Sequence, residues 1–292
     1  MTALERIKSN LNTGGPHLGD LIWWGLADAR VSRATLKQVW AGAGLDPAHL
    51  PEPPTPEKAM KLAARSAALG QADRLVRLGK EDEEELVFTV VREHREEDGS
   101  LTYSQEARVV LARRHETVST DSPGHDLAEA IRGRYSELKD THPSDDIRRA
   151  IMNVIGACSA VTLRDHGGVY WVPAPHASTL RRLQNAVERI GSSRVHLLPV
   201  HASADANKTL GEAAKIAIED ELAALKAEVE GFLAAPPERA STLVRRLDAF
   251  DALRSRAELY RDVLNVHVQD LEATLQQLSA NIEGLLNQKA AA

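Results

Sequence analysis

The chain of 292 residues has one cysteine, few aromatic residues and no long uninterrupted apolar run. Because Cys158 has no second cysteine, an internal disulfide is excluded, and its place on an apolar helix face predicts a buried thiol. No segment reaches the roughly 18 apolar residues that a membrane-spanning helix needs, and the first residues lack the apolar core of a signal peptide. We therefore expect a cytoplasmic protein with no membrane partner.

Several motifs of known chemistry are also missing. The pair Lys208-Thr209 lacks the preceding glycines of a phosphate-binding loop. The chain has no Gly-x-Ser-x-Gly elbow, His-Glu-x-x-His helix or Cys-x-x-Cys pair, so serine hydrolase and ordinary zinc sites are not indicated. We expect no cofactor, assign no catalytic or metal-binding residue, and favour a protein that is not an enzyme.

The net charge of −6 argues against general coating of nucleic acid or anionic membranes, although it leaves room for a local basic patch. With 43% hydrophobic residues, the chain is able to bury a sizeable core. The apolar patterns predict an α+β protein in three parts. These are an N-terminal helical segment (1–80), a central β-hairpin and helix domain (81–205), and a C-terminal coiled-coil hairpin of long helices (206–292).

The N-terminal segment is predicted to contain short helices. One covers 18–29, with Trp23 and Trp24, and a second begins at the cap Ser32 and carries Trp40 on its apolar face. The pair forms either a small helical subdomain around Trp40 or a helix-turn-helix motif. In the second case Arg33, Lys37 and Gln38 would face outward. Further on, 57–69 is predicted as a helix and the acidic run 81–85 as a solvated linker.

The central domain has the densest series of start, stop and turn signals. Strands are predicted over 86–95 and 101–113, joined by a turn at Asp98-Gly99. Alternating apolar residues in the second strand predict one buried face, with Gln105 as the exception. The alternating residues are Leu101, Tyr103, Ala107, Val109 and Leu111. Downstream we expect helices over 126–139 and 144–157, a hairpin over 161–172, a helix over 180–190 and a strand over 195–200.

The run from Gly167 to Pro173 reads Gly-Gly-Val-Tyr-Trp-Val-Pro. It resembles a hairpin of uncharacterised bacterial and phage proteins, which carry a similar Gly-Gly-Val-Tyr-aromatic-Val-Pro run before a helix. The resemblance covers the central third of the chain. It brings no known activity, so it implies no role for any residue.

The order strand, helix, helix, hairpin in the central domain is that of a winged helix. The second helix would then enter a major groove, while the hairpin would contact phosphates. The candidate residues for binding nucleic acid or another partner are Arg148, Arg149, Asn153, Arg164, His166, Tyr170, Arg181 and Arg182. Asp145 and Asp146 would repel phosphates at the start of that helix, so a solvated helix face is the alternative.

Two metal sites are weaker alternatives. Asp126, Glu137 and Lys139 have the loose spacing of a metal-dependent nuclease, but the last two lie in a helical pattern that points them apart. Four histidines also gather in the central stretch, where two or three of them could converge on a metal. The simpler interpretation is that they are surface or hydrogen-bonded histidines. They are His166, His176, His196 and His201.

The C-terminal part has the most specific pattern. Apolar residues at alternating steps of three and four predict a long helix over 253–287 with a coiled-coil interface. The interface residues are Leu264, Val268, Leu271, Leu275, Leu278, Ile282 and Leu285. This stripe must be covered either by the helix predicted over 210–233 or by a second chain. The leading hypothesis is a non-catalytic interaction or assembly protein that uses the coiled coil for self-association or partner binding. A nucleic-acid-binding protein dimerised by the same helices is the alternative, and a nuclease is less favoured.

Overall fold

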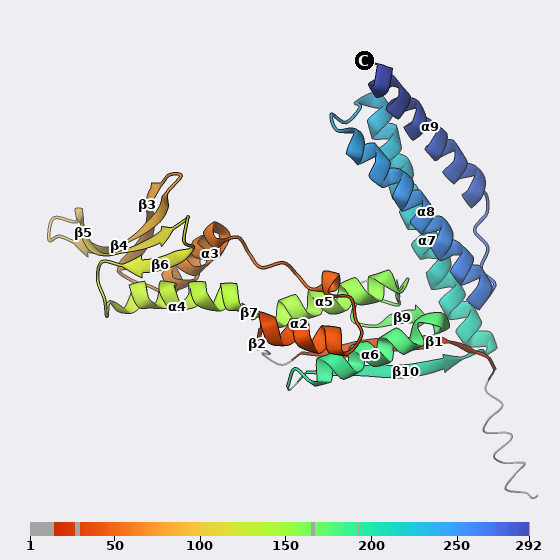
Figure 1. Ribbon diagram of the computed structural model, residues 1–292, viewed down its shortest axis with the longest axis horizontal. Helices are drawn as coiled ribbons and strands as arrows, with labels where there is room; N and C mark the ends of the chain where they lie inside the picture. Colours follow the sequence, from red (N-terminus) through yellow and green to blue (C-terminus); the bar gives the residue numbers. More distant parts are fainter. Residues whose placement is uncertain (1–14, 27–29, 165–166, 192, 292) are drawn as a thin grey trace, which may run out of the picture. The chain divides into compact units, whose positions relative to one another are not determined.

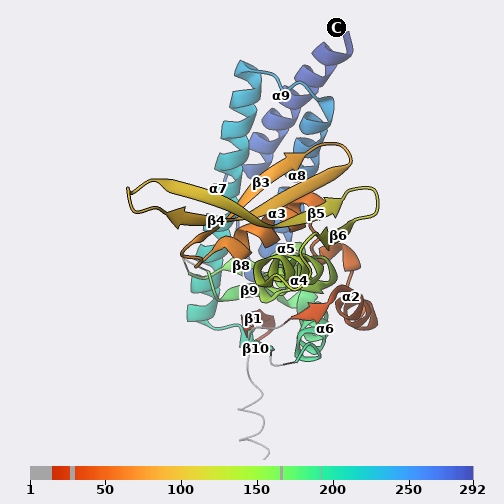
Figure 2. The ribbon, with the colours of Figure 1, turned by 90° about the vertical axis from the view of Figure 1, so that its left-hand side faces the viewer.

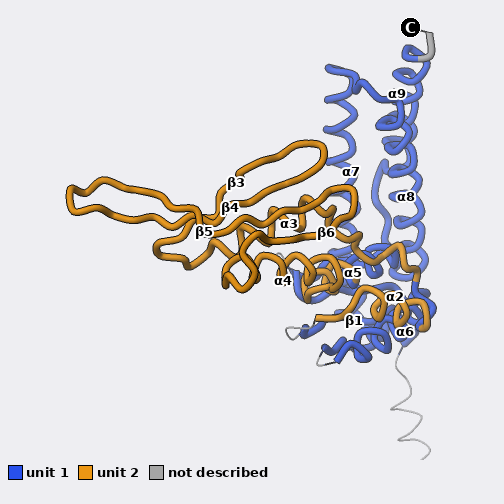
Figure 3. The backbone as a smooth tube through the Cα atoms, turned by 60° about the vertical axis from the view of Figure 1, so that its left-hand side comes forward, with its two compact units in different colours: residues 1–27, 43–45, 151–292 blue, residues 28–42, 46–150 orange. Residues whose placement is uncertain are grey.

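The computed structural model describes residues 15–26, 30–164, 167–191 and 193–291, and it divides the chain into two compact units (Figures 1 and 3). Unit 1 comprises residues up to 27, residues 43–45 and residues from 151 onward. Unit 2 comprises residues 28–42 and 46–150. The described residues form α-helices and antiparallel sheets and end in a helical region, which confirms the α+β class. No described helix is both long enough and apolar enough to span a bilayer.

Unit 1 contains a four-stranded antiparallel sheet in the order β10-β1-β9-β8. The strands are β1 (His17–Gly25), β8 (Val161–Thr162), β9 (Tyr170–Pro173) and β10 (Arg194–His201). The helix predicted over 18–29 is therefore wrong in its described part. A short apolar run fits a doubly buried strand as well as a helix, and the strands that pair with β1 lie far along the chain. For the same reason no helix-turn-helix forms there.

The expected hairpin is present as β8 and β9, but its sheet differs from a winged helix. β1 pairs with β9 on one side and with β10 on the other. The strand that was expected to join the hairpin, β5, belongs to another sheet in unit 2. The winged-helix arrangement is thus corrected to an open four-stranded sheet in which β1 lies between β9 and β10, two strands that come much later in the chain.

Both faces of the unit 1 sheet are buried at β9, whereas the edge strand β10 is largely exposed. Trp171 and Val172 are neighbours on β9 and point to opposite faces, yet neither side chain is exposed. Trp171 packs against Tyr260 of the C-terminal helices, with ring centroids 6.0 Å apart. On the other face, Arg181 of α6 (Ala177–Glu188) reaches the buried Asp20 of β1. Helix α6 confirms the helix predicted over 180–190.

The C-terminal region of unit 1 has three helices that pack on one another (Figure 1). They are α7 (Ala204–Ala234), α8 (Ala240–Leu264) and α9 (Leu271–Ala291). The single helix predicted over 253–287 is wrong, because Asn265 adopts a left-handed conformation with φ 55° and ends α8. The heptad spacing continues across the loop that follows, and Val268 lies in that loop.

Unit 2 is built around a four-stranded antiparallel sheet in the order β3-β4-β5-β6 (Figure 2). The strands are β3 (Arg74–Glu81), β4 (Glu85–Arg95), β5 (Leu101–Ala112) and β6 (Thr117–Thr120). They confirm the two predicted strands, while the expected linker at 81–85 comprises the end of β3, a hairpin turn at 82–84 and the start of β4. Two helices, α3 (Pro56–Ala68) and α4 (Asp126–Asp140), pack on one face of this sheet.

A second part of unit 2 lies where α4 ends. The two-residue strands β2 (Val31–Ser32) and β7 (Thr141–His142) pair with each other. Helix α2 (Arg33–Gly42) follows β2, and Ser32 caps it as predicted, its Oγ accepting a hydrogen bond from the Thr35 amide at 3.0 Å. Helix α5 (Ser144–Ala157) follows β7, and its residues from Ile151 onward belong to unit 1. A proline-rich arm with the short helix η1 (Pro47–His49) joins α2 to α3.

A β-bulge in β5 changes which residues are buried. Val90 pairs with Ala107 while Val91 pairs with Gln105, so Glu106 is an extra residue on β5. An extra residue reverses the alternation of side chains. Leu101 and Tyr103 therefore lie on the face opposite Ala107 and are 48% and 51% exposed. The prediction that they share its buried face is wrong.

Candidate functional site

The residues predicted on α5 are exposed, and acidic neighbours pair with two of them. Arg148 lies 2.7 Å from Asp145, and Arg149 lies 3.8 Å from Asp146. Asn153 is exposed farther along the helix. Asp145 and Asp146, which were expected to repel phosphates, thus lie close to both arginines and partly neutralise their charge.

The residues predicted on the hairpin and α6 belong to unit 1. Tyr170 stacks on Trp24 with ring centroids 5.6 Å apart. Arg181 forms an ion pair of 3.3 Å with Asp20, which is only 1% exposed, and the Arg182 Nη1 donates to the Gly44 carbonyl at 3.1 Å. These contacts give Arg181 and Arg182 structural partners. Arg164 is exposed, and His166 lies outside the described residues.

The nuclease candidates do not share a site. Asp126 binds Arg74 at 2.8 Å, and this hydrogen bond holds the pKa of its carboxyl below the usual range. Glu137 pairs with Arg134 at 2.7 Å, whereas Lys139 pairs with a different acid, Glu116. Each candidate is therefore bound by its own partner of opposite charge.

The described histidines are dispersed. His176 is half-buried, and burial lowers its pKa. His196 stacks on Trp23 with centroids 5.2 Å apart, and His201 lies beside His17 at 5.6 Å. Within the described ranges, no group of three His, Cys, Asp or Glu side chains is placed to hold a metal.

The residues predicted as the coiled-coil interface are mostly buried inside unit 1. Leu264, Leu275, Leu278, Ile282 and Leu285 belong to one core together with residues of α7 and α8. Of the two alternatives for covering the apolar stripe, the structure thus shows the first, in which helices of the same chain cover it.

Sequence analysis missed a polar cluster in unit 2. His142 is 3% exposed, and its Nδ1 lies 2.9 Å from Asp146 Oδ2. Arg33 donates from Nε to the Lys139 carbonyl at 2.6 Å and from Nη2 to the Leu138 carbonyl at 3.0 Å, at the end of α4. Its Nη1 lies 3.2 Å from His142 Nε2. The cluster joins α2, α4, β7 and α5.

The electrostatics of this cluster favour a neutral imidazole. Burial lowers the pKa of His142, and the charge of Arg33 adds to this effect, while the hydrogen bond with Asp146 opposes it. A neutral ring that donates from Nδ1 to Asp146 has a lone pair on Nε2 that accepts from Arg33. Only the spacing of His142 and Asp146, one helical turn apart, was visible in the sequence.

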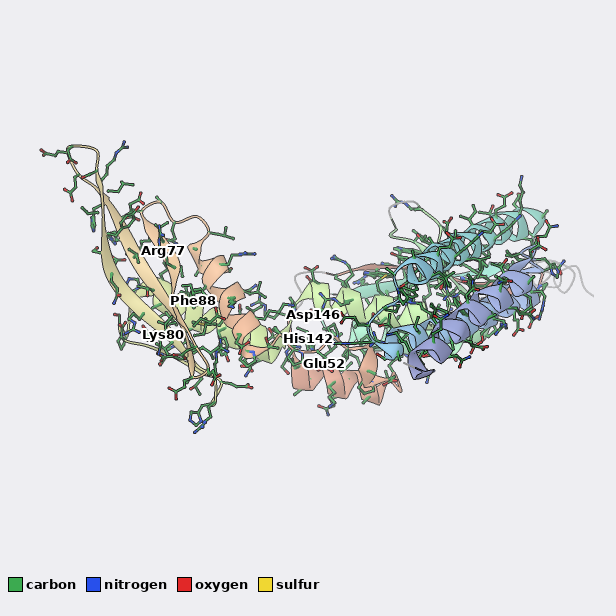
Figure 4. All side chains as sticks on the ribbon, turned by 90° about the horizontal axis from the view of Figure 1, so that it is seen from above. Glu52, Arg77, Lys80, Phe88, His142 and Asp146 are labelled. Atoms are coloured by element: carbon green, nitrogen blue, oxygen red, sulfur yellow. The ribbon has the colours of Figure 1, made fainter. Side chains whose placement is uncertain are left out.

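Two hollows lie beside the cluster. The first, of about 410 Å³, is lined by Arg33, Lys37, Glu52 and His142 together with η1 and prolines of the arm. The second, of about 470 Å³, shares Arg33 and Glu52 with the first. Its other charged lining residues are Lys58, Asp146 and Arg149. Figure 4 shows Glu52, His142 and Asp146 close to one another. We call this pair of hollows the charged groove.

A second candidate surface is the sheet face of unit 2 that α3 and α4 leave uncovered, which we call the open face. Cross-strand pairing places its side chains on one side of the sheet. Its principal residues are Leu75, Arg77, Val91, Arg95, Leu101, Tyr103 and Arg108. The Arg77 guanidinium lies over the Tyr103 ring, 5.6 Å from its centroid. Figure 4 labels Arg77 and Lys80 on this sheet.

The charges of the open face are mostly positive. Lys80 is neutralised by Asp82 and Glu85, at 2.6 Å and 2.8 Å. In the described residues, no acid pairs with Arg95, and Arg77 has only its contact with Tyr103. Glu93 binds the Tyr103 hydroxyl, which is the first cause of the raised pKa of that tyrosine. The Arg108 backbone amide donates to Asp121 Oδ1 at 2.7 Å, and the charge of Arg108 also lowers the pKa of that carboxyl. The open face therefore combines a half-exposed aromatic ring with two arginines, Arg77 and Arg95, that lack acidic partners in the described part of the chain.

The fold and these two surfaces define an α+β protein with a doubly covered sheet, a helical C-terminal region and a second sheet with an open face. A family model of unknown function, DUF6744, matches residues 17–291. The chain belongs to this family, as the resemblance to an uncharacterised family led us to expect. No curated protein and no solved structure matches the chain.

Proposed function

We propose that the chain is a non-catalytic binding protein whose open face binds single-stranded nucleic acid. The observation that carries this proposal is the pairing of a half-exposed Tyr103 with Arg77 on a sheet that is covered on one side only. Bases of a single strand stack on aromatic side chains and arginine planes, whereas bases within a duplex are already stacked on one another.

The remaining side chains of the open face support a nucleic-acid ligand. Arg95 and Arg108 are exposed at two places along the strands and are available to phosphates. Val91 and Leu75 give the floor an apolar surface that the faces of bases would cover. Unit 2 as a whole has more acidic than basic residues, so cations on this face are a local concentration rather than a general property.

Binding is measured by fluorescence anisotropy with a labelled single-stranded 12-mer and with the matching duplex. The single strand is expected to bind more tightly. If Arg77, Arg95 and Arg108 neutralise phosphates, the slope of log K against log salt is about −2, and each Arg→Ala change reduces its magnitude by about 0.7. Tyr103→Ala is expected to remove about 1–3 kcal/mol of stacking.

Two other variants serve as controls. Arg65 is exposed on α3, on the helical side of the same unit, so Arg65→Ala should leave affinity unchanged. The double change Arg148→Ala with Arg149→Ala tests the surface on α5. No binding in 50 mM salt contradicts the proposal, as does an equal loss in Arg65→Ala. Duplex binding that depends on Arg148 and Arg149 would place recognition on α5.

Assembly through the C-terminal helices is a separate prediction with less support. Leu275 and Ile282 are completely buried within their own chain, so they are not available to a second copy. Light scattering of the full chain measures its molar mass, and we expect that of a monomer. A stable dimer would return the assembly hypothesis to first place.

A further inference from the structure

We propose that the charged groove of unit 2 is a binding site for a small phosphate monoester. The groove uses none of the open-face residues, so this inference does not depend on nucleic-acid binding. Its charged lining residues are Arg33, Lys37, Glu52, Lys58, Asp146 and Arg149.

The charges of the groove match a phosphate dianion. Its lining contains four cations and two acids. Asp146 is occupied by His142 at 2.9 Å and lies 3.9 Å from Arg33. Lys37 and Lys58 have no acidic partner among the described residues, and Arg149 is 63% exposed despite its 3.8 Å contact with Asp146. The two hollows together have an excess of two positive charges, which is about the charge that a phosphate monoester carries near pH 7, and each hollow alone has an excess of one.

The walls of the groove are preorganised. Prolines 47, 51, 53, 54 and 143 line it, and each fixes its own backbone φ. Arg33 is held by two carbonyls of α4, and the buried His142 supports it from one side. A rigid site loses little conformational entropy when a ligand binds. Each hollow also lies within the range of about 300–1,000 Å³ that is usual for small-molecule sites.

Glu52 restricts the class of ligand further. It lies on the arm and lines both hollows. A carboxylate there opposes a polyanion but accepts a hydrogen bond from a hydroxyl or amine of the ligand. The groove therefore fits a molecule with one phosphate and a neighbouring donor, and a long phosphate chain would meet repulsion at Glu52.

The test is isothermal titration of the full chain with glycerol phosphate at pH 7.5 and constant ionic strength. Lys37→Gln and Lys58→Gln are exposed changes that spare the buried cluster, and each is expected to weaken binding about tenfold through loss of a charge-assisted hydrogen bond. Glu52→Gln is expected to raise the affinity for inorganic triphosphate more than that for glycerol phosphate.

Arg65→Gln is the matched control, because Arg65 is exposed on the same helix as Lys58 and outside the groove. Arg77→Ala should also leave phosphate affinity unchanged, which separates this site from the open face. The proposal is overturned if glycerol phosphate does not bind at millimolar concentration. It is also overturned if acetate binds equally well, or if Arg65→Gln weakens binding as much as Lys58→Gln.

Discussion

The two four-stranded sheets of this protein differ in what covers them. In unit 1, Trp171 and Val172 alternate to opposite faces and both are fully buried. In unit 2, Ala107 and Val109 are buried while Arg108 between them is exposed. A strand that is apolar at every position is committed to packing on both sides, whereas an alternating strand leaves one face for solvent or a ligand. The unit 2 sheet, which has one uncovered face, is therefore the better candidate for binding a ligand.

The largest effect is expected where the sheet is covered twice. Trp171→Ala removes a completely buried ring that packs on Tyr260. Such a change typically lowers the free energy of unfolding by about 3–5 kcal/mol. Urea denaturation of the full chain, followed by circular dichroism, measures this loss. A loss below about 1 kcal/mol would mean that this face of the unit 1 sheet is not a packed core.

Unit 2 is expected to respond to pH, because a buried polar cluster joins its elements. Burial lowers the pKa of His142 in the folded state, so the unfolded chain binds the proton more readily. Stability from this group is complete above the unfolded-state pKa of about 6.5 and falls as the pH drops toward the folded-state value. Thermal unfolding at pH 7.5 and 5.5 should show this loss, and His142→Asn should reduce it. An unchanged pH dependence in the variant would assign the loss to other groups.

The turn between α8 and α9 tests why the heptad pattern is interrupted. Asn265 has a left-handed backbone, which costs an alanine roughly 1–2 kcal/mol. Asn265→Ala is expected to destabilise the chain by about that amount, while Asn265→Gly should be close to neutral because glycine adopts this conformation readily. Urea denaturation distinguishes the two. Equal effects would indicate that the asparagine side chain, not its φ angle, matters.

The smallest effect on stability is expected on the open face. Tyr103 is 51% exposed, and its ring supports no buried core. Tyr103→Ala should change the free energy of unfolding by no more than about 0.5 kcal/mol, as is usual for surface positions. A much larger loss in urea denaturation would show that the open face is covered, and it would weaken the case for a binding surface.

Local patterns predicted most elements whose signals lie within the element itself. The turn at Asp98-Gly99, the cap at Ser32 and the alternation that buries both Val109 and Leu111 were all readable from the sequence. The failures required information from elsewhere in the chain. β1 was predicted as a helix because nothing in His17–Gly25 reveals its pairing with β10. The bulge at Glu106 was missed because one extra residue leaves the apolar count of β5 almost unchanged.

The candidate sites were less predictable than the fold. Arg33 was expected to face outward, because the residues that hold it lie more than a hundred positions later. Arg181 was expected on a binding surface, but it pairs with a buried aspartate whose burial follows only from the sheet. Of the residues predicted on α5, the hairpin and α6, only Arg149 lines the charged groove, which also contains Lys37 from the helix-turn-helix alternative. Convergence of distant residues is set by tertiary packing, which periodicity does not report.

The topology of unit 1 has a consequence for how the chain is made. The central strand β1 emerges early from the ribosome, but its partners β9 and β10 follow only after the whole of unit 2 has been synthesised. At about 5–20 residues per second, β1 waits on the order of ten seconds with its apolar residues and its backbone groups unpaired. Unit 2, whose own strands are neighbours in sequence, is able to fold during that interval. Nascent chains that stall within unit 2 would therefore expose β1, and they are natural substrates for chaperones.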